Sequence, residues 1–313
     1  MSTTANSELF GPVLEYPDNA AKARYDALVG IDDIKQQLVT EASVLINPQV
    51  LEEWSTRHHG SRIAAVQAVA QRTPLVVLAG DVGTGKTELA ESVADPIARA
   101  LRLDTLTLYP MSLSARGRGM VGEMTTLITQ AFEHVRASLG RPRDSQGRVR
   151  NAAILLIDEA DAIAQSRELA QMHHEDRAGV NALIRAIDGL RRDNVPVLTI
   201  MCTNRSDALD PAISRRAAHV FNFTRPTTLQ RTHVLTTALA GTGISASDIE
   251  AAAVALGPNG AQSWGATYSD LRQRLIPNLV LASYAAKSPV TGAALLAAAE
   301  QFQPTRPFGG SDD

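Results

Sequence analysis

Short apolar runs alternate with helical patterns through the middle of the chain. Between the runs, apolar residues return at helical spacing, as at Leu89, Val93 and Ile97. This alternation is typical of an α/β fold, and it predicts a doubly wound parallel sheet of five strands. The five runs are Leu75–Ala79, Thr105–Tyr109, Ala153–Ile157, Val197–Met201 and His219–Phe223.

The pattern changes at both ends of this region. Residues 1–24 are polar and contain Pro12 and Pro17, which indicates a flexible arm. After residue 226 the strand signals stop, and an alanine-rich helical pattern follows. We therefore expect a flexible arm over 1–24, a large α/β domain over 25–226 and a small all-helical lid with a short tail over 227–313.

Composition limits the classes of function. The chain has 313 residues and a formal net charge of -3, so it has no general basic surface for nucleic acid. Its single cysteine, Cys202, excludes an intrachain disulfide and suits a reducing compartment. The sequence has neither a secretory signal pattern nor a run of about twenty apolar residues that would span a membrane. We expect a cytoplasmic protein.

The stretch from Gly80 to Thr87 fits the phosphate-loop pattern G-x-x-x-x-G-K-[ST]. An apolar strand pattern precedes it and a helical pattern follows it, which is the required context. In such a loop, backbone N–H groups and the helix N-terminus surround a polyphosphate. Lys86 adds a full positive charge, and the Thr87 hydroxyl can reach Mg²⁺. A glycine-rich turn that holds no ligand is the alternative interpretation.

A second motif closes the apolar run Ala152–Asp161 with adjacent carboxylates. At the end of a strand, Asp158 can hold Mg²⁺ through water, and Glu159 can orient and deprotonate the water that attacks the γ-phosphate. A solvated acidic turn is the bland alternative.

Three further polar residues follow later strand patterns. Asn204 ends the run "VPVLTIMCTN", where its amide can hydrogen-bond the attacking water or the γ-phosphate. Arg215 and Arg216 stand in tandem before the last strand pattern. An arginine presented to the nucleotide of a neighbouring subunit stabilises transition-state charge, with rate effects on the order of 10³ to 10⁵. A turn residue and a surface charge pair are the alternatives.

In their order, these motifs resemble the AAA+ ATPases, and specifically the AAA clade. The resemblance rests on the phosphate loop, "LLIDEAD", "VNALIRAIDG", "CTN" and "LDPAISRR", and it covers roughly residues 25–303. It implies a homohexameric ring that binds ATP with Mg²⁺ at subunit interfaces. The roles implied are Lys86, Thr87, Asp158 and Glu159 acting in one subunit, Asn204 as sensor 1, and Arg215 and Arg216 as fingers in trans.

The same resemblance assigns more of the nucleotide site. Val29 and Gly30 in "DALVGIDDIKQQL" would lie against adenine, and Arg272 is the best candidate for the sensor 2 arginine. Asp81 and Val82 replace the usual prolines of the loop, which we expect to be tolerated because the loop binds through its backbone. The remaining expected contacts are Gly83, Thr84, Gly85 and Glu88.

The segment "GMVGE" falls where the clade carries a pore loop that grips an extended polypeptide. Met120 takes the aromatic position of that loop, with Val121 and Gly122 after it. Methionine packs against irregular side chains, so gripping remains feasible. These residues also precede a helical pattern, so a purely structural role stays open.

The segments "AGVNALIRAIDGL" and "DLRQRLIPNLVLASY" resemble the pachytene-checkpoint ATPases in a small bacterial form. That resemblance implies ATP-driven partial unfolding of a HORMA-domain protein. In bacteria it implies a part in CBASS antiphage signalling, where the ATPase restrains a HORMA-activated nucleotidyltransferase.

Three alternative functions remain open: two belong to other classes, and the third is remodelling of a different protein client. A nucleic-acid motor or loader is motivated by the basic stretches Gly140–Arg150 and Arg116–Gly119. A nucleotide-gated scaffold without turnover is disfavoured by Glu159 and Asn204. A remodeller of another protein client is the third alternative.

Overall fold

The computed structural model describes residues 9–112, 123–161, 174–205, 209–260 and 262–308. The chain divides into two compact units, which are described separately. The sheet unit comprises Met1–Asp26, Asp33–Ala79 and Thr87–Asn222. The lid unit comprises Ala27–Asp32, Gly80–Lys86 and Phe223–Asp313, so it includes the phosphate loop as well as the C-terminal region in which the lid was expected.

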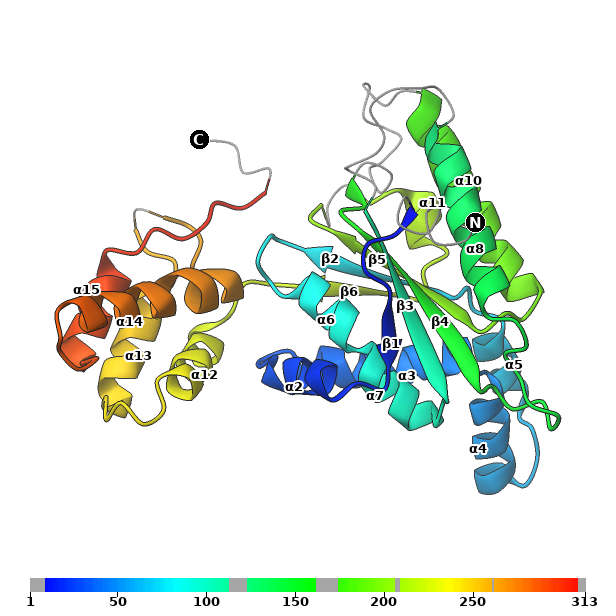
Figure 1. The fold of residues 1–313 in the computed structure, drawn as a ribbon, viewed down its shortest axis with the longest axis horizontal. Coiled ribbons are helices and arrows are strands. Elements are labelled where there is room, and N and C mark those ends of the chain that lie inside the picture. Colours follow the sequence, from blue (N-terminus) through cyan, green and yellow to red (C-terminus); the bar gives the residue numbers. More distant parts are fainter. Residues whose placement is uncertain (1–8, 113–122, 162–173, 206–208, 261, 309–313) are drawn as a thin grey trace. The chain divides into compact units, whose positions relative to one another are not determined.

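Within the described residues, six strands form one sheet in the order β1-β3-β4-β5-β2-β6 (Figure 1). The pairs β3–β4, β4–β5 and β2–β5 are parallel, and β1 is antiparallel to β3. The α/β fold is confirmed, but the expected count of five strands was wrong because the chain adds a short edge strand. The strands are β1 (Leu14–Tyr16), β2 (Leu75–Gly80), β3 (Thr105–Ser112), β4 (Asn151–Asp158), β5 (Val197–Thr203) and β6 (His219–Phe223).

The added strand corrects the expectation of a flexible arm over residues 1–24. Phe10 and Tyr16 are each 3% exposed. The Phe10 ring packs edge-on against Tyr109, with centroids 5.1 Å apart. The Tyr16 hydroxyl donates to the Glu91 carbonyl over 2.7 Å. These contacts anchor the described part of the segment, because burial of two aromatic rings outweighs the polar composition around them.

The polar residues of the same segment begin a helix. The Asp18 carboxylate accepts from the backbone N–H of Ala21 at 2.8 Å, which caps α2 (Asn19–Ala27). Pro12 and Pro17 lie on either side of β1, so neither occupies a position in its ladder. In sequence the two prolines indicate flexibility, whereas in the structure they border an ordered strand.

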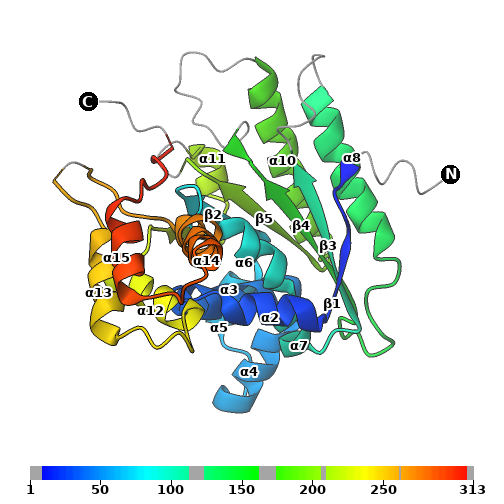
Figure 2. The same ribbon diagram turned by 60° about the vertical axis from the view of Figure 1, so that its left-hand side comes forward.

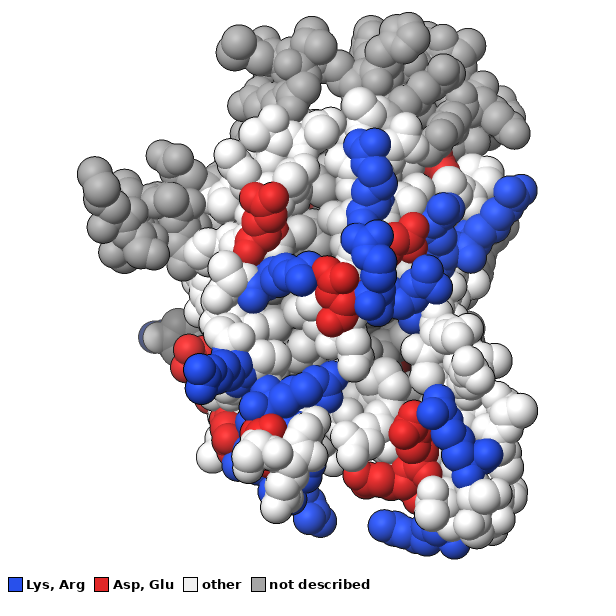
Figure 3. All heavy atoms as spheres, turned by 90° about the vertical axis from the view of Figure 1, so that its right-hand side faces the viewer, with Lys and Arg blue, Asp and Glu red and all other residues white. Residues whose placement is uncertain are grey.

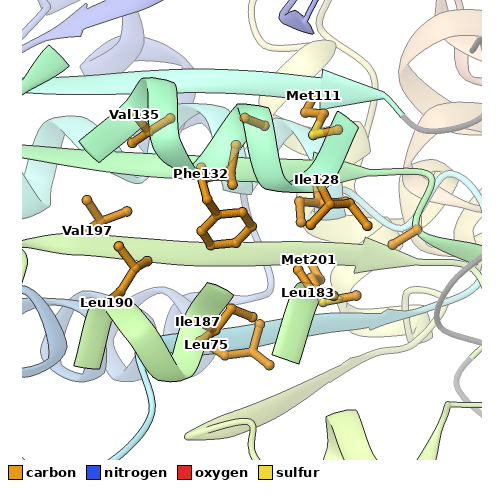
Figure 4. Packing of buried hydrophobic residues seen from close by; sticks show 14 of the residues in the cluster. Leu75, Met111, Ile128, Phe132, Val135, Leu183, Ile187, Leu190, Val197 and Met201 are labelled. Carbon is orange, nitrogen blue, oxygen red and sulfur yellow. The ribbon is translucent and has the colours of Figure 1, made fainter. Parts of the chain in front are cut away.

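One face of the sheet is covered by α8 (Glu123–Ser138) and α10 (His174–Arg192). Their apolar side chains interdigitate with those of the strands beneath (Figure 4). Burial of this apolar surface, at about 25 cal/mol per Å², is the main force that holds the layer in place. The labelled core residues are Leu75, Met111, Ile128, Phe132, Val135, Leu183, Ile187, Leu190, Val197 and Met201.

The opposite face is covered by α3 (Asp32–Ile46), α6 (Lys86–Ser92) and α7 (Ala94–Leu101), as Figures 1 and 2 show. Because helices lie on both faces, β2 and β5 are buried along their whole length. The other helices of the sheet unit's described part include α4 (Gln49–His59), α5 (Ala64–Ala70) and α11 (Pro211–Ser214). Across the described ranges, every helix is too short or too polar to span a bilayer.

The described C-terminal part of the lid unit is helical, as expected. Its helices are α12 (Thr228–Ala238), α13 (Ala246–Ala255), a π-helical turn (Asp270–Leu275), α14 (Ile276–Ala285) and α15 (Gly292–Glu300). Pro277 stands in the first turn of α14, directly after the widened π-helical turn. Proline cannot donate to the preceding helical turn, and a π-helical turn accommodates such a break. The lid core is formed by Val234, Leu235, Leu239, Ile249, Leu271, Leu275, Leu279 and Leu295, among others.

Among the described residues of the C-terminal, helical part of the lid unit, two charged side chains are buried. Arg231 is 3% exposed and donates to the Ala253 carbonyl at 2.7 Å and to the Pro226 carbonyl at 2.6 Å. Burial lowers the pKa of Arg231. Because one guanidinium satisfies carbonyls from two segments, it fastens α12 to α13.

Asp270 is the second charged residue, and it is 1% exposed. Its carboxylate accepts from the backbone N–H groups of Thr267 and Thr305, each at 3.0 Å, and from Arg274 Nη1 at 2.7 Å. Burial alone would raise the pKa of Asp270, but these hydrogen bonds to the charged form hold it below its usual value.

Replacing Arg231 with Met should destabilise the lid by about 2 to 4 kcal/mol, because buried carbonyls lose their donors. Of the two tryptophans, Trp264 belongs to the lid unit, so urea unfolding followed by its fluorescence in a Trp54→Phe background reports on the lid. Leu229→Ala is the matched control, since Leu229 is 79% exposed. Equal midpoints for Arg231→Met and the control would contradict the buried-anchor role.

Asp270→Asn should reduce lid stability at pH 7, and the reduction should become smaller as the pH falls through the lowered pKa of Asp270. A carboxylate whose pKa is lowered by folding contributes stability above its unfolded pKa, and this contribution is lost as pH falls through the folded pKa. The difference in urea midpoint between wild type and Asp270→Asn should therefore shrink below about pH 4. Glu250→Gln, at an exposed lid position, serves as the control. A difference that stays constant with pH would contradict the ionic role of Asp270.

Candidate functional site

The phosphate loop occupies Gly80–Lys86, between β2 and the first turn of α6, as the sequence predicts. Lys86 is 6% exposed, and its Nζ donates to the carbonyls of Gly80 and Asp81, each at 2.8 Å. The Thr84 hydroxyl donates to the same Asp81 carbonyl at 2.7 Å. The loop is thus closed by its own side chains, with Lys86 held against its carbonyls.

Two positions in the loop require glycine. The φ angle is 149° at Gly80 and 74° at Gly83, outside the region that L side chains favour. A Cβ on Gly80 would lie 2.1 Å from the Phe223 carbonyl oxygen, and one on Gly83 would lie 2.7 Å from Thr267 Oγ1. The glycines predicted from the motif therefore allow both the turn and the close packing of the loop within the lid unit.

The expected adenine-contacting residues, Val29 and Gly30, also lie in the lid unit. Val29 packs against the lid core, and the Gly30 carbonyl accepts from Gln230 Nε2 at 2.5 Å. Tyr268 lies beside Gly30, and burial raises the pKa of its hydroxyl to about 12. This segment is therefore held by a hydrogen bond from Gln230 and packs beside Tyr268.

Arg272, the expected sensor 2 arginine, lies in the π-helical turn Asp270–Leu275. Its Nη2 donates to the Ala27 carbonyl at the start of the same opening segment. The lid unit thus joins phosphate loop, opening segment and Arg272, which are the parts that the resemblance assigns to nucleotide binding.

In the sheet unit, Asp158 ends β4 and Glu159 follows it with a left-handed backbone, φ 51°. Asp158 Oδ1 accepts from the Glu159 N–H at 2.9 Å, which stabilises the sharp turn after the strand. A left-handed conformation at a non-glycine residue costs about 1–3 kcal/mol and tends to occur at functional positions. The backbone therefore turns sharply at Glu159, directly after Asp158 ends the strand.

Thr87 and Glu88 lie in the first turn of α6, and both are exposed. Glu88 lies 3.5 Å from Arg24. Further along α6, the pKa of Glu91 is raised by burial and by the negative charges of Glu88 and Asp158. The field of Asp158 thus reaches α6, the helix that carries Thr87.

Asn204 follows β5 and is held by a residue that the sequence reasoning did not single out. Asp161 Oδ1 accepts from the Thr203 hydroxyl at 2.6 Å and from the Asn204 N–H at 2.8 Å. Asp161 Oδ2 lies 3.2 Å from the Asn204 side-chain nitrogen. Asp161 therefore fixes both the backbone and the amide of Asn204, and its place in the "DEAD" run is the signal that would have revealed it.

Arg215 and Arg216 follow α11 and are exposed. The Asp210 carboxylate caps α11 by accepting from the Ala212 N–H at 2.7 Å. Arg216 Nε lies 3.5 Å from Asp188 Oδ2 in α10, so an ion pair within the same chain orients it. Both arginines stay available to a molecule that approaches this surface.

The expected pore-loop residues Met120, Val121 and Gly122 lie outside the described residues. The basic stretch Gly140–Arg150 is described, and two of its four arginines form ion pairs: Arg148 lies 3.0 Å from Asp144, and Arg150 lies 2.5 Å from Asp104. On the face drawn in Figure 3, Asp and Glu side chains lie between those of Lys and Arg. This mixture does not favour a nucleic-acid surface.

The residues present fit a magnesium nucleotide. Gly80, Gly83 and Gly85 all have positive φ angles, so the loop backbone can turn its N–H groups toward a polyphosphate, and Thr87 and Asp158 offer the oxygen ligands that Mg²⁺ prefers. Among the described side chains, no group of three or more His, Cys, Asp or Glu is placed to hold a metal ion by itself. Mg²⁺ usually binds through one or two protein ligands together with the phosphates of the nucleotide, which agrees with this arrangement.

Comparison with known proteins extends these observations. Residues 76–225 match the AAA family, the ATPase family associated with various cellular activities. The chain is 48% identical over 277 residues to CD-NTase-associated protein 6 of Escherichia coli strain MS 115-1, covering 88% of this chain and 89% of that protein.

Two solved structures are similar over nearly the whole chain. One is a chain in the structure of the E. coli MS115-1 HORMA:CdnC:Trip13 complex, with a TM-score of 0.88, 45% identity, and coverage of 97% of this chain and 98% of that chain. The other is Rhizobiales Trip13, with a TM-score of 0.73, 43% identity, and coverage of 96% and 100%. The chain therefore is an AAA-family ATPase of the group that includes CD-NTase-associated protein 6 and Trip13.

Proposed function

We propose that this ATPase remodels a HORMA-domain protein and thereby restrains a nucleotidyltransferase in CBASS-type antiphage signalling. The observation that carries this proposal is the near full-length similarity to a chain of the HORMA:CdnC:Trip13 complex. A match over 97% of the chain includes the lid unit as well as the sheet. The similarity therefore supports a shared task and not just a shared nucleotide-binding core.

ATP binding is assigned to the phosphate loop and the segments packed with it. Backbone N–H groups of Asp81–Gly85 and the Lys86 ammonium hold the phosphates, and Val29 and Gly30 contact adenine. Lys86 exchanges its bonds to the loop carbonyls for bonds to phosphate oxygens. Arg272, now bound to the Ala27 carbonyl, contributes positive charge from the lid.

Hydrolysis is assigned to the residues at the ends of β4 and β5. Thr87 and Asp158 hold Mg²⁺, which when bound supplies positive charge against the phosphates. Glu159 orients the attacking water and accepts its proton, and the left-handed backbone at this residue turns it away from the strand. Asn204, fixed by Asp161, supports the water or the γ-phosphate.

The assembly that we propose is a homohexameric ring in the cytoplasm. Arg215 and Arg216 would act on the nucleotide of a neighbouring copy, where their exposure allows this contact. Within the Arg215–Arg216 pair, the ion pair with Asp188 fixes the side chain of Arg216. The client would be gripped by Met120, Val121 and Gly122 and drawn into the pore, which unfolds one of its ends.

Glu159→Gln should bind ATP but hydrolyse it about 10²- to 10⁴-fold more slowly, because the general base is lost. With a HORMA protein and its partner nucleotidyltransferase, wild type should dissociate their complex when ATP is present. Glu159→Gln should retain ATP and hold the HORMA protein, while Lys86→Ala should fail to bind nucleotide. The measurements are phosphate release, nucleotide retention and gel filtration of the complex.

Three outcomes would contradict the proposal in different ways. Equal loss of nucleotide in Glu159→Gln and Lys86→Ala would show that Glu159 is structural. ATP hydrolysis without dissociation of the HORMA complex would leave a motor with another client. Steeply salt-dependent DNA binding that stimulates hydrolysis would indicate a nucleic-acid motor instead.

Asp161→Asn should lower kcat about tenfold and change the affinity for ADP less than threefold. The substitution weakens the hydrogen bonds that position Asn204 and leaves the residues of the phosphate loop unchanged. Asp193→Asn is the matched control, since Asp193 pairs with Arg136 elsewhere in the sheet unit. The checks are steady-state hydrolysis and calorimetric titration with ADP. A parallel loss of ADP affinity and kcat would argue against a role confined to Asn204.

A further inference from the structure

The phosphate loop carries a carboxylate that is bound by an arginine of the lid unit. Arg225 Nε donates to Asp81 Oδ2 at 2.7 Å, and Arg225 Nη2 lies 2.5 Å from the same oxygen. The two side chains are 14% and 19% exposed, respectively, so water screens the pair little. Arg225 lies two residues after the end of β6 and directly before Pro226.

The same two side chains hold the end of the described chain. Arg225 Nη1 donates to the Gly265 carbonyl at 2.7 Å and to the Thr305 carbonyl at 2.8 Å. Asp81 Oδ1 accepts from the backbone N–H of Phe308 at 3.1 Å. The phosphate loop is thus fastened directly to the segment Gln303–Phe308, which we call the C-terminal strap.

The strap is also fastened to the helix turn that carries the sensor 2 candidate. Besides its N–H, Thr305 donates its hydroxyl to Asp270 at 2.7 Å, and Arg274 Nη2 donates to the Gln303 carbonyl at 3.3 Å. Asp270 and Arg274 belong to the same π-helical turn as Arg272. One end of the strap is therefore bound to that turn and the other to the phosphate loop.

Electrostatics gives the pair a further consequence. Asp81 places a negative charge in a loop whose N–H groups bind polyphosphate, and like charges repel most strongly where water is excluded. Arg225 neutralises that charge. If Arg225 alone is removed, Asp81 remains as an unpaired anion beside the phosphates; if both are replaced by neutral residues, the repulsion disappears.

We propose that Arg225 keeps the phosphate loop competent for nucleotide by neutralising Asp81, and that the Asp81–Arg225 pair couples occupancy of the loop to the C-terminal strap. When nucleotide phosphates bind the backbone N–H groups of the loop, the loop shifts and moves the Asp81 carboxylate. The hydrogen bond from the Phe308 N–H to Asp81 then changes, and the strap responds. The proposal rests on ATP binding by this ATPase and is independent of the client, so it fails or holds separately from the HORMA assignment.

The first test is a double-mutant cycle with ADP titrated calorimetrically into full-length protein. Arg225→Gln should raise the Kd about 10- to 30-fold, Asp81→Asn should change it less than threefold, and the double variant should recover most of the loss. Arg150→Gln, which breaks an arginine–aspartate pair in the sheet unit, is the matched control. Additive effects without recovery would overturn the electrostatic role, because the unpaired charge of Asp81 would then not account for the loss of affinity.

The second test is hydrogen exchange of the strap with and without ADP. In wild type, ADP should change exchange at the Phe308 amide, and Asp81→Asn should abolish that response while ADP still binds. Arg225→Lys keeps the charge but loses the forked contacts, so it should bind ADP within about threefold of wild type and exchange faster over Gln303–Phe308. An unchanged wild-type strap, or an equal response in Asp81→Asn, would overturn the coupling.

Discussion

The parallel pairing of β4 with β5, and of β5 with β2, determines where the chemistry of the sheet unit lies. The register places Ile157 opposite Met201 and Ala79 opposite Thr203. The three strands therefore end on the same side of the sheet: Asp158 is the last residue of β4, Asn204 directly follows β5, and the phosphate loop begins at the end of β2. A slip of one residue would turn every side chain to the opposite face, so apolar burial on both faces also fixes the positions of Asp158 and Asn204.

The features that could be predicted from sequence are those encoded by local pattern. Strand, glycine-rich turn and helix follow one another within Leu75–Leu101, so the phosphate loop could be placed without tertiary information. The ordered N-terminal segment could not, because the apolar residues around Phe10 and Tyr16 form no regular period and Pro12 and Pro17 interrupt the stretch. Their stabilising partners are distant in sequence, with 75 positions between Tyr16 and the Glu91 carbonyl that it binds.

The same division holds within the site. Sequence motifs predict Lys86, Thr87, Asp158 and Glu159. The roles of Asp161 and Arg225 can be inferred only from their contacts in the folded chain. Asp161 at least stands inside a motif, but nothing near Arg225 in the sequence points to a loop 144 positions away. The roles of the site residues and of the pore loop at Met120 stay predictions, since the comparisons establish the family and not the task of each side chain.

Gly83 illustrates how narrowly this loop fits its surroundings. The Ser269 N–H donates to the Gly83 carbonyl at 3.1 Å, and a Cβ on Gly83 would also meet the Ser269 Cβ at 3.0 Å. Loop and lid are therefore shaped as a matched pair, although about 180 residues of chain separate them. The two surfaces are therefore constrained together: a lid with a different surface at Ser269 would fit this loop only if the loop changed with it.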